Sequence, residues 1–143
     1  MTIKKYLSQF SKLDKIIDSS FLRIEELKKF SLKSRSFLSA AGGNLGRASN
    51  VEKALERVEK AEKRLTNDID KYFDLQEKIQ NLVLALDNYE ERALLERHYL
   101  LGQTWEKVAE ECFVSLRTVH YLHNNALKKL EPYYEKLKEG LSC

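Results

Sequence analysis

Hydrophobic residues recur at alternating steps of three and four along two long stretches of the chain. The first stretch runs from about residue 2 to residue 30, and Ser20 is the only polar member of its apolar seam. The seam consists of Ile3, Tyr6, Phe10, Leu13, Ile17, Ser20, Ile24 and Leu27. This heptad spacing predicts a helix that packs against another helix along its whole length.

The same rhythm returns between residues 51 and 87. Its members are Val51, Leu55, Val58, Glu62, Leu65, Ile69, Tyr72, Gln76, Ile79, Val83 and Leu86. Two of these positions are polar, and the adjacent residues Ala61 and Leu75 can replace them in the seam. Ser49 and Glu52 have the spacing of a capping box, which predicts that this second helix begins near Ser49.

Residues 31–50 contain five serines and three of the five glycines, and they show no period. We therefore expect a flexible linker there. Neither helix can bury its stripe alone, so residues 1–87 are predicted to fold back as an antiparallel hairpin, a coiled-coil arm. The broad stripes leave apolar area for a second copy of the chain. This favours a homodimer formed through the N-terminal arm, with a monomeric hairpin as the alternative.

A second domain is expected over residues 88–143. Asn88 and Glu91 have the spacing of a helix start, and Gly102 suits the left-handed end of that short helix. Residues 105–122 then have the spacing of a helix-turn-helix, with the small residue Ala109 where the two helices touch. Interior positions of that motif are filled by Val108, Cys112, Val114, Val119 and Leu122. The expected fold class is all-α.

The turn of this motif departs from the usual pattern at one position. Phe113 stands where a glycine usually provides a positive φ, which costs about 1 kcal/mol for a bulky residue. Either the turn has a different shape, or the Phe113 side chain gains contacts, for example with the arm. Thr104 and Ser115 are expected to cap the two helices.

Two segments of this domain resemble region four of the major bacterial sigma factors. The first, residues 96–110, holds an arginine-tyrosine pair, a glycine, a polar cap and an E-x-V-A core, and the second covers residues 114–130. The whole layout is similar to proteins of Gram-positive phages and prophages and, more loosely, to ArpU- and RinA-type regulators of phage late operons. The resemblance implies a DNA reader whose second helix enters the major groove, in a module that docks on RNA polymerase.

Helical spacing from Ser115 assigns the candidate contacts without the resemblance. Val119, Leu122, Ala126, Leu127 and Leu130 fall on one face, and the opposite face is polar. The candidate DNA-binding residues are Thr104, Ser115, Leu116, Arg117, Thr118, His120, Tyr121, Asn124 and Lys128.

Each type of candidate contact has a chemical reason. Arg117 can bond guanine O6 and N7 in a bidentate pair, which is worth about 1–3 kcal/mol of discrimination. Tyr121 and Asn124 can touch base edges or phosphate, and Leu116 or Thr118 can meet a thymine methyl. Phosphate contacts are expected from Ser115, Thr104, Lys128 and Lys129.

Charge is distributed unevenly along the chain, whose net charge is +3. Residues 1–87 hold 17 basic and 13 acidic groups, and residues 88–143 hold 8 and 9. The first helix of the motif carries Glu106, Glu110 and Glu111, which are unfavourable near phosphate. This balance favours weak DNA binding by one copy, strengthened by dimerisation or by RNA polymerase.

Catalytic, metal and cofactor sites are not expected. The sequence has no glycine-rich phosphate loop and no nucleophile placed beside a base. His98, His120 and His123 suggest a metal site with Cys112, but Cys112 occupies a core position of the motif and His120 and His123 diverge from it, so a zinc site is disfavoured. Two cysteines, no signal-peptide pattern and no long apolar run favour a soluble cytoplasmic protein. Because no catalytic constellation is visible, we do not expect an enzyme.

The hypothesis is therefore a phage-encoded transcriptional regulator that binds promoter or operator DNA. One alternative is a DNA-packaging protein similar to a small terminase subunit, which would form a ring. Another is an adaptor that grips polymerase or a sigma factor without touching DNA, in which case the polar face is only solvated.

Overall fold

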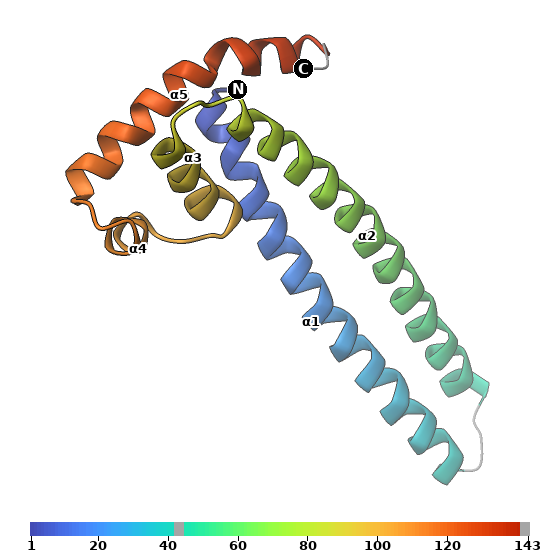
Figure 1. Ribbon diagram of the computed structural model, residues 1–143. Coiled ribbons are helices and arrows are strands. Elements are labelled where there is room, and N and C mark those ends of the chain that lie inside the picture. Colours follow the sequence, from blue (N-terminus) through green and yellow to red (C-terminus); the bar gives the residue numbers. More distant parts are fainter. Residues whose placement is uncertain (42–44, 141–143) are drawn as a thin grey trace. The chain divides into compact units, whose positions relative to one another are not determined.

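The computed structural model describes the backbone of residues 1–41 and 45–140, and their side chains apart from residues 34, 35, 37–41 and 45–49 (Figure 1). In chain order the elements are α1 (Ile3–Ala41), α2 (Leu45–Leu84), α3 (Tyr89–Leu95), the π-helical turn η1 (Glu96–Leu100), α4 (Trp105–Glu111) and α5 (Leu116–Lys138). No strand occurs in these ranges, so the described chain is all-α, as predicted.

The prediction of an irregular linker over residues 31–50 is wrong for the described residues. α1 continues to Ala41 and α2 already begins at Leu45, four residues before Ser49. The segment contains no proline, and the hydroxyl of Ser31 donates to the carbonyl of Leu27 at 3.1 Å, so this serine bonds within the helix. The proposed cap at Ser49 is wrong as a helix start, and its side chain lies outside the described residues.

Contacts divide the chain into two compact units, and the divisions fall within α1 and α2. One unit comprises Asp14–Lys71, and the other comprises Met1–Leu13 together with Tyr72–Cys143. The sequence pattern instead places a boundary between residues 87 and 88. The first part of α1 and the last part of α2 therefore belong to the same unit as α3, α4 and α5.

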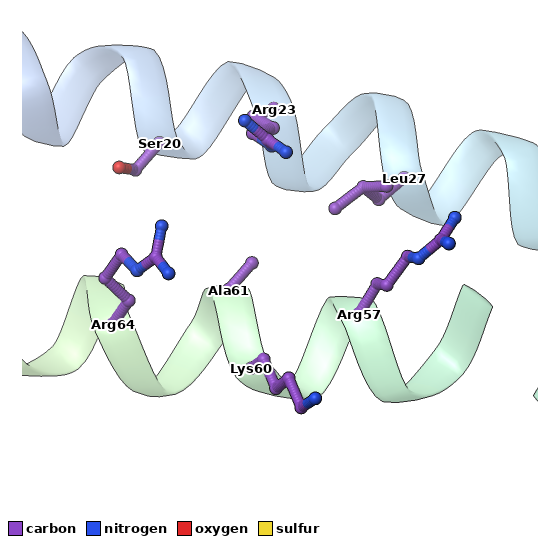
Figure 2. A pocket seen from close by; sticks show the side chains of 7 residues that line it. All are labelled: Ser20, Arg23, Leu27, Arg57, Lys60, Ala61 and Arg64. Atoms are coloured by element: carbon purple, nitrogen blue, oxygen red, sulfur yellow. The ribbon is translucent and has the colours of Figure 1, made fainter. Parts of the chain in front are cut away.

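The unit of residues 14–71 is a pair of helices that run side by side in opposite directions. Ser20 and Leu27 of α1 lie across from Arg64 and Arg57 of α2 (Figure 2). Its buried apolar residues are Ile17, Ile24, Val51, Ala54, Val58 and Leu65. All but Ala54 belong to the predicted seams; Ala54 is buried where the seam placed Leu55, which is only half-buried. Ala61 is half-buried whereas Glu62 is exposed, so the alanine replaces the glutamate in the seam as expected.

The other unit has a core that joins both chain segments. From the long helices it contains Leu7, Phe10, Ile79 and Val83; from the later helices it contains Leu94, Leu95, Tyr99, Val108, Val119, Ala126, Leu130 and Tyr134. The hydroxyl of Tyr134 donates to the carbonyl of Met1 at 3.1 Å. The start of α1 is thereby fixed against α5. None of the described helices is long and apolar enough to cross a membrane.

Candidate nucleic-acid interface

Three polar residues begin the three later helices, as predicted. Oδ1 of Asn88 accepts from the backbone N–H of Glu90 and Glu91 at 2.9 and 3.1 Å. Oγ1 of Thr104 accepts from the N–H of Lys107 at 3.2 Å, and Oγ of Ser115 accepts from the N–H of Thr118 at 3.1 Å. These caps fix where α3, α4 and α5 begin.

The connection between α4 and α5 keeps the left-handed residue of the usual turn. Phe113 has a φ of +57° and its side chain is 94% exposed. The backbone N–H groups of Cys112 and Val114 bond to the carbonyls of Val108 and Ala109 at 2.9 and 3.1 Å. Phe113 therefore adopts the positive φ that glycine usually provides and keeps its ring exposed. Neither expected alternative, a turn of different shape or new contacts of the ring, is seen in the described structure.

α5 packs against the other helices by the face that the sequence indicates. Val119, Ala126 and Leu130 are fully buried, and Leu122 and Leu127 are partly buried against the same core. The inward set is thus confirmed. His123 lies on this face as well and is only 5% exposed. Sequence reasoning missed it, although its spacing of four from Val119 and three from Ala126 was a usable signal.

All of the candidate DNA-binding residues are exposed. Along the outer face of α5, Arg117, Tyr121, Asn124 and Lys128 follow one another at steps of four, three and four, which places them in one stripe. Tyr121 is 65% exposed and Leu116 is 39% exposed. Thr118 lies on one flank, where its hydroxyl is 2.9 Å from that of Ser115, and Thr104 lies at the start of α4.

Lys129 does not belong to this surface, which corrects the expected phosphate contact. Its Nζ donates to both carboxylate oxygens of Glu91 on α3, at 2.9 and 3.1 Å. Glu91 is 2% exposed, so its charge depends on this lysine for compensation. Helical spacing could not reveal the pair because the partner lies 38 residues away.

The acidic residues of α4 divide into one paired and two free groups. Glu111 forms ion pairs with Arg97 and, at 3.5 Å, with Lys107. Glu106 and Glu110 are exposed and have no ion pair among the described residues. Two cations near the candidate interface, Arg97 and Lys107, are therefore occupied by a carboxylate.

A cluster of aromatic and imidazole rings lies beneath the start of α5. Trp105 stacks on His98 with ring centroids 3.6 Å apart and an interplanar angle of 14°. His98 Nδ1 is 2.7 Å from the carbonyl of Gln103, and the hydroxyl of Tyr99 is 2.6 Å from Nε2 of His123. These contacts support α5 from below. The exposed candidate residue His120 also meets the cluster, with its ring centroid 5.9 Å from that of Trp105.

Burial keeps these rings uncharged. It lowers the pKa of His98 and lowers that of His123 to about 4, where the nearby charge of Lys4 acts in the same direction. Burial also raises the pKa of Tyr99 to about 12. At neutral pH the cluster therefore contributes no positive charge to the surface above it.

No group of three or more His, Cys, Asp or Glu side chains within the described ranges is arranged to hold a metal ion. Comparisons with protein-family models, with curated proteins and with solved structures found no match to this chain.

Proposed function

We propose that this protein is a sequence-specific DNA-binding regulator of transcription, in which α4, the turn at Phe113 and α5 act as a helix-turn-helix. One observation carries the proposal: the stripe of Arg117, Tyr121, Asn124 and Lys128 is exposed along a helix whose opposite face is buried. An α-helix presented in this way fits the major groove of B-DNA.

The side chains of the stripe match the chemistry of base edges and phosphates. Arg117 reads guanine, Tyr121 and Asn124 contact base edges or phosphate, and Leu116 or Thr118 meets a thymine methyl. Thr104, Ser115 and Lys128 hold phosphates and set the register, with His120 at the edge of the surface.

One copy of the chain carries few free cations at the candidate interface, so self-association is needed to strengthen the proposed DNA binding. Ile16, Phe21, Leu22 and Phe30 are each more than 50% exposed on α1. We propose that the long helices form a coiled-coil arm that joins two copies, and that the dimer acts in the cytoplasm of a bacterium infected by or carrying a phage. RNA polymerase is a proposed second partner, in line with the resemblance to region four of sigma factors.

Fluorescence anisotropy with a random duplex at low salt tests DNA binding directly, and the absence of binding would overturn the proposal. Selection of bound fragments from random DNA, with and without RNA polymerase, then tests sequence preference. A dimer by mass in solution supports regulation. A ring of eight or more copies would instead support a packaging protein.

A further inference from the structure

Exposed cations gather on one side of the helix pair in the unit of residues 14–71. Arg23 of α1 and three cations of α2 line a hollow of about 220 Å³, whose remaining lining residues are Ser20, Leu27 and Ala61. Figure 2 shows Arg57 and Arg64 extending from α2 toward α1 on either side of Ala61. Lys60 lies between these two arginines in the sequence. No carboxylate of the described residues lines the hollow, and we call this surface the basic groove.

The basic groove continues along α2 beyond the hollow. Lys53, Arg57, Lys60, Arg64 and Lys71 are all exposed and are separated by steps of four, three, four and seven, which keeps them on one side of the helix. Asp68, which is half-buried, stands on the same side between Arg64 and Lys71. The stripe is roughly 27 Å long at 1.5 Å per residue. None of these cations forms an ion pair with a carboxylate of the described residues.

The opposite side of the same helix pair has a different character. A second hollow there is lined by Glu59 and Glu62 of α2, together with Lys28 and Leu32 of α1. The second hollow thus has two carboxylates in its lining, whereas the hollow of the basic groove has none. Unpaired like charges held in a row repel one another, and a polyanion would relieve that repulsion.

We propose that the basic groove binds the phosphate backbone of nucleic acid as a second contact that does not read sequence. This inference rests on the proposed function. A linear row suits a polymer of phosphates better than a single small anion, and arginine binds phosphate in a bidentate manner. The row also supplies charge that α4 and α5 lack: between Trp105 and Leu130, Arg117 and Lys128 are the cations without a carboxylate partner in the described structure.

The test uses the full-length chain and a random duplex. The triple variant Arg57→Gln, Lys60→Gln and Arg64→Gln removes the centre of the basic groove. The control Lys15→Gln, Lys28→Gln and Lys63→Gln removes three exposed cations of the same unit that do not line it. Both variants change the net charge equally, and circular dichroism with thermal unfolding checks that both fold.

We expect the basic-groove variant to bind random duplex at least tenfold more weakly at low salt, and the control variant to change less than about twofold. The slope of log K against log salt should fall by about 0.9 for every phosphate that the variant no longer neutralises. Equal effects of the two variants would overturn the proposal. So would stoichiometric binding of pyrophosphate that the basic-groove variant abolishes while its duplex affinity is unchanged, since the ligand would then be a small anion.

Arg117→Ala separates this inference from the proposed function. If Arg117→Ala loses sequence preference while the basic-groove variant behaves like its control, only the proposed role of the basic groove is wrong. If the full-length chain binds no duplex at all, both proposals fail.

Discussion

The hydroxyl of Tyr99 lies 2.6 Å from Nε2 of His123, and both side chains are buried under the first turns of α5. This hydrogen bond joins the segment before α4 to the helix that carries the proposed DNA-binding stripe. A neutral imidazole can accept from the tyrosine hydroxyl, and an imidazolium cannot.

The buried imidazole makes stability depend on pH. His123 has a pKa of about 4 in the folded chain and about 6.5 when unfolded, so the unfolded chain binds more protons between these values. The contribution of His123 to the unfolding free energy is therefore complete above about pH 6.5 and falls by about 3 kcal/mol as the pH is lowered to 4. Chemical denaturation of the wild type and of His123→Gln across this range checks it. The unfolding free energies of the two proteins, plotted against pH, should converge as the pH falls. Parallel plots would refute the role of His123.

Lys129 and Lys128 are adjacent lysines with different roles. Replacing Lys129 by Met leaves the buried carboxylate of Glu91 without its partner and should cost about 2–3 kcal/mol of unfolding free energy. Lys128→Met should cost less than about 0.5 kcal/mol because Lys128 is exposed and has no ion pair in the described structure. Equal unfolding free energies of the two variants would show that the pair does not stabilise the fold.

Phe113 is strained and unburied at the same time. Its φ of +57° suits glycine, and its ring is 94% exposed, so Phe113→Gly should stabilise the chain by about 1 kcal/mol. Phe113→Ala keeps the strained backbone and should change stability by less than about 0.5 kcal/mol. Thermal unfolding of both variants tests this, and a destabilised glycine variant would mean that the ring makes contacts that matter.

Ser115 combines a structural and a proposed functional role, and two substitutions separate them. Ser115→Ala removes the cap of α5 and should cost about 1 kcal/mol of stability. Ser115→Asp keeps an oxygen for the N–H of Thr118 and should retain that stability, but its charge should repel phosphate and weaken DNA binding. Unchanged DNA affinity in the aspartate variant would remove Ser115 from the interface.

Periodic and local features of this fold were predictable from sequence. The seams of α1 and α2, the caps at Asn88, Thr104 and Ser115, and the inward face of α5 follow from helical geometry alone. The extension of both long helices into residues 31–50 was missed because abundant serine and glycine indicate a linker. Serine can also bond within a helix, as Ser31 does. The Glu91–Lys129 pair and the Tyr99–His123 hydrogen bond depend on tertiary packing between segments far apart in sequence.

The candidate interface was predictable only as a surface. Helical phase identifies which residues of α5 face outward, and all of the candidates are exposed. Their action on DNA stays a prediction. The basic groove was not foreseen because its cations come from two helices, and only their packing brings Arg23 beside Arg57 and Arg64.

The most direct test of the central claim compares Arg117→Ala with the wild type on two duplexes, one enriched by selection and one random. We expect the ratio of the two affinities to fall roughly five- to 150-fold, equivalent to about 1–3 kcal/mol, because alanine cannot form the bidentate pair with guanine. Arg117→Lys should lose most of the same preference while retaining affinity for random DNA. Lys128→Ala should weaken both complexes equally. An equal loss of affinity on both duplexes for Arg117→Ala would contradict the assignment of the outer face of α5 as the surface that reads DNA sequence.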